Sequence, residues 1–446
     1  MNIIIVGDEE IGYYLARSLS KLNHNVTIID QHAEDLQQLE ADTDLLTVLG
    51  DSSSPGVLLE ASVKDTDLLI SVQHDEKINL ITSILAKKMG AKRTIARINN
   101  VEFLAPRNKQ MFKDIGVDEL VCPERIAAKE IINLLARNAA AEVYDFSDGL
   151  IMVYTLRIDE NCMVINKSLN EISLLYPDVE ARCLCILRKG KIIIPDRSDS
   201  YQINDFVYLI VTPESLPKVK ELGGKKEYAV KSAIIAGGGR IGLRTALDTE
   251  DKMQIKLIDS DKERCYELAN IVNSTMIING DANDMELLRD EGLEDTDAFI
   301  AVTDSTETNI LTCLHAKKQG VKKTIALVEN VNYIDVSQDL GIDAIINKKL
   351  ITASYIIRFT INAEVTSGKW LSGIDAEIIE VLVKEKSPAT KRYIKRLLLP
   401  DGVNIGGIIR NGKAMIATGE TQIESGDKVI VFTIPESASK LMKLFN

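Results

Sequence analysis

The sequence predicts two α/β domains with doubly wound parallel sheets, each followed by a small β-rich α+β domain. Short, continuously apolar runs alternate with helical patterns in two stretches of the chain, as in parallel strands that are buried on both faces. The two stretches repeat each other, with Gly7 and Gly12 of the first aligned with Gly237 and Gly242 of the second. The β-rich regions that follow them also repeat, with Arg188 aligned with Arg410.

The first α/β stretch shows the alternation clearly. Apolar runs predict strands at residues 2–6, 26–29, 45–49, 68–72 and 94–98, with helical segments between them. The first helical segment has an apolar stripe made of Ile11, Tyr14, Leu15, Leu19 and Leu22. The second stretch repeats this pattern from residue 232 to about residue 346.

Matching segments show that the repeat is a duplication. Gly50-Asp51 recurs as Gly280-Asp281, and the run KKMGAKRTIA at 87–96 returns as KKQGVKKTIA at 317–326. A helix is expected after each sheet, at 124–140 and 349–363, with an apolar stripe that packs within the chain or between chains. The predicted order is therefore four domains, at 1–140, 141–222, 230–363 and 370–446.

Composition limits the classes of function. The 446 residues carry 53 basic and 66 acidic side chains, and the net charge of −13 disfavours a nucleic-acid partner, because phosphate backbones attract clustered Lys and Arg. No run approaches the roughly 18 apolar residues of a membrane span, and the first residues lack the basic start and long apolar stretch of a signal peptide. We expect a cytoplasmic protein that reaches a membrane only through a partner.

Cysteine and histidine give no sign of metal or redox chemistry. The six cysteines are scattered without a CxxC pair, and none of the four histidines stands in a metal-ligand or nucleophile motif. Cys183 and Cys185 lie two residues apart in an apolar run, so on a strand they share one face. Core packing is the expected role of the cysteines.

The strongest functional motif opens the second repeat. The apolar run 233–236 leads directly into Gly237-Gly238-Gly239-Arg240-Ile241-Gly242, a GxGxxG that begins a helix. In the Rossmann-like dinucleotide motif the first glycine allows a tight turn, the second lets the backbone approach a pyrophosphate, and the third packs the helix on the strand. Asp259 ends the next strand, where a carboxylate binds ribose hydroxyls and favours NAD over NADP. The alternative is a glycine-rich turn with no ligand.

The first repeat carries an altered version of this loop, Gly7-Asp8-Glu9-Glu10-Ile11-Gly12, with Asp30 at the end of the second strand. Glu9 occupies the position of the middle glycine, and its side chain obstructs the approach of a phosphate. Each like charge within about 5 Å of the phosphate costs on the order of 1 kcal/mol. A retained fold with weak or altered ligand binding is therefore at least as good an interpretation as a working site.

Further candidate ligand contacts follow other predicted strands, because open α/β sheets bind ligands at the carboxyl ends of their strands. They are Gln73-His74 and Thr303-Asp304 after the fourth strand, Asp51 and Asp281-Ala282 after the third, where an adenine would rest, and Arg97 at the end of the fifth. Arg97 and Arg240 are placed to contact a phosphate, and a surface salt bridge is the alternative role for both.

These motifs resemble the TrkA family, the cytoplasmic nucleotide-binding subunits of Trk-type bacterial potassium uptake systems. The resemblance covers essentially the whole chain and rests on the two glycine loops, Gly280-Asp281-Ala282, Ala301-Val302-Thr303, Ala96-Arg97-Ile98, Leu399-Pro400-Asp401-Gly402 and Ile423-Glu424-Ser425-Gly426-Asp427. It implies Rossmann-like regulator-of-potassium-conductance (RCK) domains that bind NAD(H), ATP or ADP. It also implies a homo-oligomeric ring, typically of four chains, under a membrane potassium-transporting protein.

The resemblance further implies nucleotide contacts, which are residues 7–11, Asp30, Gln73, His74 and Arg97 in the first repeat and residues 237–241, Asp259, Thr303 and Asp304 in the second. Because Glu9 departs from the family's loop, the second site is favoured over the first. The resemblance places the protein peripherally at the inner face of the plasma membrane.

Three classes of function are in competition: an NAD-dependent oxidoreductase, a regulator without catalytic activity, and a structural scaffold with vestigial loops, against which the intact second loop argues. Hydride transfer needs a general acid or base near the nicotinamide. The β-rich regions, about 75 residues each, show no such constellation, so a regulator without catalytic residues or metal is the preferred hypothesis. The sequence leaves open which nucleotide is the signal and which way it regulates.

Overall fold

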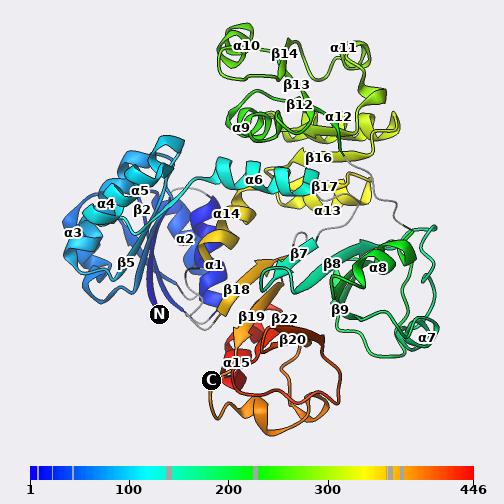
Figure 1. The fold of residues 1–446 in the computed structure, drawn as a ribbon. Helices are drawn as coiled ribbons and strands as arrows, with labels where there is room; N and C mark the ends of the chain where they lie inside the picture. The colour runs from blue at the N-terminus through cyan, green and yellow to red at the C-terminus, as the bar shows by residue number, and fades with distance from the viewer. Residues whose placement is uncertain are drawn as a thin grey trace. The chain divides into compact units, whose positions relative to one another are not determined.

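The computed structural model describes residues 1–7, 10–22, 24–42, 45–136, 143–224, 230–357, 359, 365–371 and 376–445. The chain separates into two compact units, Met1–Ile132 with Lys231–Thr360 and Asn133–Val230 with Ile361–Asn446. The first unit holds both α/β repeats and the second holds both β-rich regions (Figure 1). Like parts of the duplication therefore fold together although they alternate in the sequence. The four predicted domain boundaries stay a prediction.

The first α/β repeat is a parallel sheet with the strand order β3-β2-β1-β4-β5-β6. Its strands are β1 (Asn2–Val6), β2 (Asn25–Asp30), β3 (Leu46–Leu49), β4 (Leu68–Ser71), β5 (Arg93–Arg97) and β6 (Glu119–Val121). The order reverses between β1 and β4, which is the point where doubly wound sheets open a crevice for a ligand. The predicted fold class is confirmed here.

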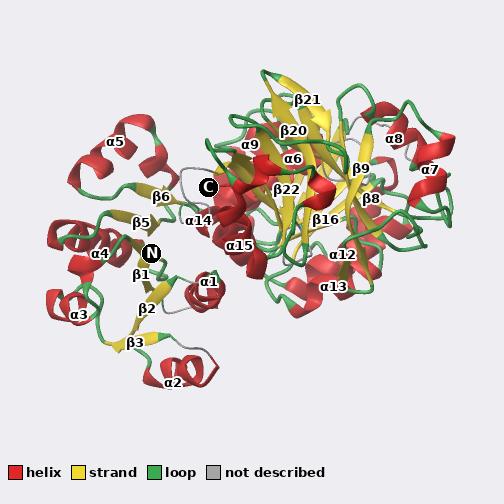
Figure 2. Ribbon diagram, turned by 90° about the horizontal axis from the view of Figure 1, so that it is seen from below, coloured by secondary structure: helices red, strands yellow, loops and turns green. Residues whose placement is uncertain are grey.

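Helices cover both faces of this sheet. They are α1 (Glu10–Lys21), α2 (Ala33–Asp42), α3 (Pro55–Glu60), α4 (Glu76–Met89) and α5 (Pro106–Ile115), with short 3-10 turns η1 (Val63–Asp65) and η2 (Val101–Leu104). A further helix, α6 (Pro123–Ala136), follows β6 and does not lie on this sheet (Figure 1). In Figure 2, α1 and α2 lie on one face of the sheet, and α3, α4 and α5 lie on the other. Burial on both faces explains why the strands are continuously apolar.

The second α/β repeat has the same topology, with the strand order β14-β13-β12-β15-β16-β17. Its strands are β12 (Ser232–Ala236), β13 (Gln254–Asp259), β14 (Met276–Asn279), β15 (Ala298–Ala301), β16 (Lys323–Leu327) and β17 (Ala344–Ile346). Its helices are α9 (Arg240–Thr249), α10 (Lys262–Ala269), α11 (Met285–Asp290), η3 (Leu293–Asp295), α12 (Thr306–Lys318), α13 (Asn332–Asp339) and α14 (Lys348–Ile357).

The strand predictions agree with the structure to within one residue at each end for β1 to β5. The strands β6 and β17 were not predicted, because three residues are too short to show a periodicity. The helices predicted at 124–140 and 349–363 correspond to α6 and α14, and residues 137–140 and 360–363 lie outside the described part of the chain.

The helix α14 contacts the first repeat, where it packs against α1. The Tyr355 hydroxyl donates to Glu119 Oε1 at 3.4 Å, and Arg93 Nη1 donates to the Phe359 carbonyl at 2.9 Å. Ile356 and Ile131, members of the predicted apolar stripes, are both fully buried. The stripes therefore pack within the chain, the first of the two predicted alternatives.

A buried carboxylate fastens the start of β14 in the second repeat. Glu250, directly after α9, accepts hydrogen bonds from the Asn273, Ser274 and Thr275 N–H groups and from the Thr275 hydroxyl at 2.8–3.2 Å. Burial alone would raise the pKa of Glu250, but these hydrogen bonds outweigh it and lower the pKa to about 2. The ionised form of Glu250 therefore stabilises this domain at neutral pH.

The two β-rich regions form antiparallel sheets with the orders β10-β9-β11-β8-β7 and β18-β19-β22-β20-β21. The first contains β7 (Val143–Phe146), β8 (Ile151–Arg157), α7 (Leu169–Leu175), β9 (Ala181–Arg188), β10 (Lys191–Ile193), β11 (Phe206–Val211) and α8 (Leu216–Leu222). The second contains β18 (Val365–Trp370), β19 (Glu377–Leu382), η4 (Pro388–Lys391), η5 (Ile394–Arg396), β20 (Val403–Arg410), β21 (Lys413–Ile416), β22 (Lys428–Thr433) and α15 (Pro435–Phe445).

These two sheets share one apolar core, in which Phe146 and Tyr208 of the first pack with Ile378 and Phe432 of the second. A Cβ at Gly406 of β20 would overlap Leu184 of β9, so a glycine is needed where the two sheets approach each other. Arg182 of β9 donates to the Asn404 side chain at 3.0 Å and to the Ala417 carbonyl at 2.7 Å.

All six cysteines are buried, as core packing requires, but Cys183 and Cys185 do not share a face. The pairing of β9 with β11 shifts register between Tyr208 and Leu209, which pair with Cys185 and Cys183. This β-bulge leaves Leu184 as an extra residue and breaks the alternation of side chains. Cys183 packs in the core of its own β-rich region, whereas Cys185 packs in the core shared by the two sheets.

Candidate nucleotide-binding sites

The second glycine loop has the backbone that its motif predicts. Gly237 has a φ of +110°, and a Cβ there would lie 2.7 Å from the Val302 carbonyl oxygen, so the turn lies directly against the end of β15. A Cβ at Gly242 would overlap the Gly237 carbonyl, so Gly242 allows α9 to pack on β12. Gly237 and Gly242 thus perform the turn and packing roles assigned to them.

Gly239 differs from its neighbours because it faces open space. It is the residue before α9, its backbone is extended (φ −65°, ψ −172°), and no described atom lies within 4 Å of where its Cβ would be. No side chain caps this helix end, so the first N–H groups of α9 are open to an anion. Arg240, the first residue of α9, is exposed and forms no ion pair with any described residue.

Gly238 has a role that sequence reasoning did not assign. A Cβ at this position would overlap Leu268 and approach Asp259 Oδ2 to 2.9 Å. The Gly238 N–H donates to Asp259 Oδ2 at 2.7 Å, and Arg264 Nε donates to the Gly238 carbonyl at 3.1 Å. Gly238 therefore lets the loop lie on the end of β13, and a GxG motif alone gives no signal for that contact.

Asp259 lies at the end of β13, beside the loop. Its other oxygen, Oδ1, accepts the Asp261 N–H at 2.9 Å, and the carboxylate is half-buried. Two backbone N–H groups hold the carboxylate in place and leave lone pairs on both oxygens for a ribose. Gly280, directly after β14, donates its N–H to the Asp259 carbonyl at 2.9 Å, which brings Asp281 and the buried Ala282 next to this strand end. The Asp281 carboxylate is exposed and accepts the Asn283 N–H at 2.9 Å.

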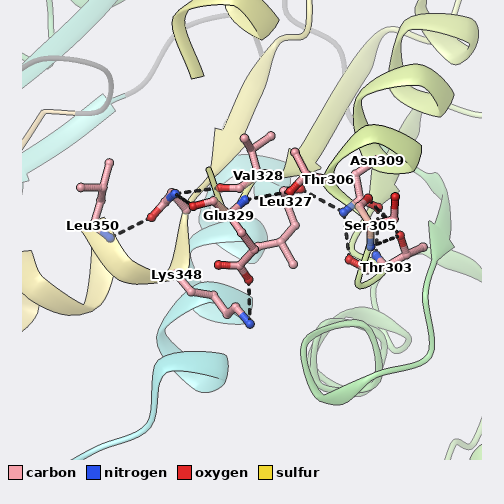
Figure 3. Close-up of polar contacts among 10 residues, drawn as sticks. Thr303, Ser305, Thr306, Asn309, Leu327, Val328, Glu329, Lys348 and Leu350 are labelled. Carbon is pink, nitrogen blue, oxygen red and sulfur yellow. Dashed lines mark hydrogen bonds and ion pairs between the residues drawn. The ribbon is translucent and has the colours of Figure 1, made fainter. Parts of the chain in front are cut away.

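The loop after β15 is organised by Asn309 of α12 (Figure 3). Asn309 Oδ1 accepts the Thr303 N–H at 2.9 Å and the Thr303 hydroxyl at 2.7 Å. Asn309 Nδ2 donates to the Thr303 and Leu327 carbonyls, both at 2.9 Å. One buried side chain thus joins the ends of β15 and β16, while Asp304 next to it is exposed.

The first repeat has an equivalent buried asparagine, and we call this arrangement of hydrogen bonds the asparagine clamp. Asn79 of α4 accepts the Gln73 N–H at 2.9 Å and donates to the Gln73 and Arg97 carbonyls at 2.8 and 3.0 Å. Sequence reasoning missed both asparagines, although they occupy equivalent positions in the duplication that aligns Gly7 with Gly237. The signal that could have found them is an asparagine at the same position of both repeats, three residues before the first of the small buried residues of each helix.

A second set of polar contacts continues from this loop to α14 (Figure 3). The Thr306 hydroxyl accepts the Glu329 N–H at 3.1 Å, and Glu329 pairs with Lys348 at 2.8 Å. Asn347 donates to the Val328 and Glu329 carbonyls at 2.8 and 3.0 Å and accepts the Leu350 N–H at 2.9 Å. The loop that would contact a ligand is thereby linked to the start of a helix that packs on the first repeat.

The first glycine loop is described in part, because Asp8 and Glu9 lie outside the described residues. A Cβ at Gly7 would lie 3.0 Å from the Gly12 Cα, so strand and helix approach closely here as well. Helix α1 begins at Glu10, and Ile11 is buried.

Asp30 differs from its counterpart Asp259. It is fully buried, its Oδ2 accepts a hydrogen bond from the Tyr13 hydroxyl, and its Oδ1 lies 2.8 Å from the His32 N–H and 2.9 Å from His32 Nδ1. Both oxygens are therefore engaged by side chains or backbone of the same repeat. A ribose would have to displace these contacts.

The other predicted contacts of the first repeat lie around this loop. Gln73 is buried and its Oε1 accepts the Ser52 hydroxyl at 3.2 Å, so its side chain supports the β3–α3 turn. His74 is exposed, Arg97 is half-buried at the end of β5, and Asp51 caps its own turn through the Ser53 N–H at 2.8 Å. Their contact with a nucleotide stays a prediction.

Comparisons with known proteins agree with this architecture. The family model of the TrkA-N domain matches residues 3–123 and 233–348, and that of the TrkA-C domain matches residues 378–446. A Trk system potassium uptake protein TrkA from Haemophilus influenzae is 30% identical over 451 residues, covering 100% of this chain and 98% of the relative. The Halomonas elongata protein of the same name is 30% identical over 438 residues, covering 97% of this chain and 96% of the relative.

Solved structures with the same fold include a GsuK RCK domain, with a TM-score of 0.61 and 18% identity over 100% of this chain and 94% of that one. A GsuK channel bound to NAD matches with a TM-score of 0.60 and 18% identity over 100% of this chain and 78% of that one. At this identity the likeness shows the fold alone. No described helix is long and apolar enough to cross a membrane.

Proposed function

Since this chain belongs to the TrkA family, we propose that it is the nucleotide-binding regulatory subunit of a Trk-type potassium uptake system and has no catalytic activity of its own. Its relatives are named for potassium uptake, and a channel of the same fold has been solved with NAD. The protein acts in the cytoplasm at the inner face of the plasma membrane. There it binds NAD(H), with ATP and ADP as competing ligands, and gates a membrane potassium-transporting subunit.

The observation that carries this proposal is the second glycine loop. The open side of Gly239, the uncapped start of α9 and the fixed carboxylate of Asp259 lie at the switch point of the sheet. This arrangement suits the pyrophosphate and the adenosine ribose of a dinucleotide. The adenine would lie near Asp281 and Ala282, and Thr303 and Asp304 would border the phosphates or the second ribose.

The first site is the weaker one in this proposal. Asp30 is already engaged by Tyr13 and His32, and the loop carries three consecutive acids in the sequence. A nucleotide would have to displace internal hydrogen bonds and accept negative charge beside its phosphates. The displaced hydrogen bonds and the negative charge both lower the affinity of the first site for a nucleotide relative to the second site.

In this proposal, the loop after β15 couples ligand binding at the second site to the rest of the α/β unit. A ligand shifts a conformational equilibrium only by its differential affinity for two states. The contacts from Thr306 through Glu329 to Lys348 couple the ligand loop to α14, which packs on α1 of the first repeat. A nucleotide that moves this loop would therefore move the two α/β repeats relative to each other.

The homo-oligomer, a tetramer in this proposal, would assemble through apolar side chains on the α/β repeats. Helices α4 and α5 of the first repeat and α12 and α13 of the second, with the residue that follows α13, expose large apolar side chains at corresponding positions. These are Ile81, Met111 and Ile115, and Leu311, Val336 and Leu340. The last two of each set align in the same register that relates Gly116 to Gly341. Matched exposed patches suit a repeated contact between copies of one chain.

The test measures binding and flux with the same nucleotide series of ATP, ADP, NAD+ and NADH. Arg240→Ala is expected to weaken ATP binding more than adenosine binding, because Arg240 lies at the phosphate end of the site. It is also expected to reduce nucleotide-dependent potassium flux in vesicles that hold the membrane subunit. A loss of stability without a change in nucleotide discrimination would assign Arg240 a structural role.

Flux that ignores nucleotide identity in the wild-type complex would contradict the regulator. Sustained NADH turnover with a small substrate would instead support the alternative hypothesis, an NAD-dependent oxidoreductase.

A further inference from the structure

The second β-rich region carries a concentration of positive charge that is unexpected in a chain with a net charge of −13. Within residues 384–396 and helix α15, the exposed basic residues are Lys384, Lys386, Lys391, Arg392, Lys395, Arg396, Lys440 and Lys443. The acids within 384–396 are limited to Glu385. We call these eight residues the basic face.

Most of this charge is not neutralised by the side chains that the structure describes. Lys395 pairs with Glu420. Lys386, Lys391, Arg392, Arg396, Lys440 and Lys443 form no ion pair with any residue whose side chain the structure describes. Uncompensated like charges repel one another, so an anionic partner would stabilise the face.

The segments that carry the basic face are fixed to one another. The Ser387 hydroxyl, before η4, donates to the Leu444 carbonyl of α15 at 2.8 Å, and the Ser437 hydroxyl of α15 donates to the Asp401 carbonyl at 2.6 Å. Between α15 and the loop 398–401 lies an open groove of about 590 Å³, with Lys440 and Lys443 along one side.

Two large apolar side chains are exposed in the same segments. Leu398, on the rim of the groove, is 90% exposed, and Tyr393 is 45% exposed. Both stand within the run KRYIKRLLLP at 391–400, so each has basic residues on its N-terminal side. Exposed leucine and tyrosine beside Lys and Arg are typical of segments that lie in a membrane interface.

The first β-rich region provides an internal comparison. It exposes Leu174 and Leu175 before a Pro-Asp pair, as the second exposes Leu398. The stretch 162–174, which corresponds to 384–396 when Arg188 is aligned with Arg410, has Lys167 and Glu171 as its charged residues. The counterpart of Lys443 is Glu221, which pairs with Lys218. The fold therefore does not require the basic face.

We propose that the basic face docks on the anionic lipid surface of the membrane, with Leu398 reaching the interface. The proposal rests on the proposed function for the presence of a membrane nearby. Positive charge matches anionic head groups, at about 1 kcal/mol for each Lys or Arg near the surface. A nucleic-acid backbone offers no apolar phase for Leu398, and a single acidic peptide would occupy the groove but leave the basic residues outside it uncovered. The lipid contact would add to contact through the membrane subunit.

The test uses the full-length chain without its membrane partner and measures co-sedimentation with two kinds of vesicle, phosphatidylcholine alone and phosphatidylcholine mixed with phosphatidylglycerol. The wild type is expected to bind the anionic vesicles, more weakly as salt is raised, and to ignore the neutral ones. Replacing Lys391, Arg392, Arg396, Lys440 and Lys443 by Gln is expected to weaken binding by about fivefold per charge, thus by roughly three thousandfold in total if the charges act independently.

A charge-matched control carries Gln at five exposed lysines elsewhere, Lys64, Lys129, Lys191, Lys231 and Lys252. It is expected to bind like the wild type. Leu398→Asp, at a position too exposed to affect folding, is expected to weaken binding at least tenfold.

Three outcomes would overturn the proposal: no anionic-vesicle binding at low salt, equal losses in the two lysine-replacement variants, or binding of poly-glutamate or DNA by the face where vesicles fail to bind. These measurements need neither a nucleotide nor potassium flux. The proposed regulatory function and the proposed lipid docking can therefore be refuted independently of each other.

Discussion

Gly239→Asp tests the nucleotide site with little disturbance of the fold. The backbone of Gly239 is in an extended conformation that any residue adopts, and no described atom lies within 4 Å of its Cβ position. The substitution is therefore expected to change the free energy of unfolding without ligand by no more than about 0.5 kcal/mol. Its neighbours do not offer this test, because a side chain at Gly238 or Gly242 would overlap Leu268 or the Gly237 carbonyl.

The effect on binding follows from charge. A carboxylate on Gly239 would lie about 5 Å from a phosphate at the start of α9, and at the effective dielectric constant of about 60 of an exposed loop each pair of unit charges costs on the order of 1 kcal/mol. The two negative charges of a pyrophosphate therefore cost about 2 kcal/mol, which corresponds to roughly a thirtyfold increase in Kd. Gly239→Ala adds volume without charge and is expected to raise Kd by less than about tenfold.

Titration calorimetry with NADH and with ATP measures both variants, and thermal unfolding without ligand verifies that they fold. Wild-type protein at a ligand concentration of 100 times its Kd is expected to gain about 2.7 kcal/mol of stability. A Gly239→Asp protein that folds normally and binds within threefold of the wild type would refute the assignment of this loop to the phosphates.

Three further predictions concern the other site, the fold and the assembly. Glu9→Gly is expected to tighten nucleotide binding at the first loop, so that calorimetry finds two strong sites per chain where the wild type has one; two equal sites in the wild type would contradict this. Glu250, with a pKa lowered from 4.5 to about 2, contributes at most about 3 kcal/mol, less where water screens the carboxylate; this stability is present above pH 4.5 and is lost as the pH falls toward 2. Urea unfolding at pH 7 and pH 3 is expected to show a smaller acid loss for Glu250→Gln, and equal losses would disprove the role of the carboxylate. Ile115→Asp with Leu340→Asp is expected to reduce the assembly to chains of 49.3 kDa by light scattering, and a wild-type monomer at micromolar concentration would exclude the oligomer.

The sheets were predictable because burial on both faces makes their strands continuously apolar. Strand β1 was predicted at its observed bounds, and β2 to β5 to within one residue. The bulge in β9 was not predictable, because an extra residue in an apolar run leaves the composition unchanged and shows only in the pairing with β11. The pairing of like regions into two units was also hidden, since contacts between segments far apart in the sequence leave no local pattern.

The glycine loop was the part of the site that could be predicted from the sequence. The backbone has no room for a side chain at Gly237 or Gly242, and this steric requirement is common to GxGxxG loops. The burial and the hydrogen bonds of the two acids at the strand ends could not be predicted from the sequence. Asp30 and Asp259 end equivalent strands, yet one is fully buried with Tyr13 and His32 and the other is half-buried against the loop. Only the three-dimensional partners of a carboxylate decide whether it is open to a ribose.

The two repeats therefore share the residues that support the candidate site but differ in the residues that would contact a ligand. The asparagine clamp is present in both repeats, with Asn79 and Asn309 joining the ends of the fourth and fifth strands through the same hydrogen bonds. Its function is to hold the loop, and both folds need it. The carboxylate and the loop glycines differ, and these are the groups that would touch a ligand. The first repeat also has a structural role that does not depend on ligand binding, because its α1 provides the surface against which α14 of the second repeat packs.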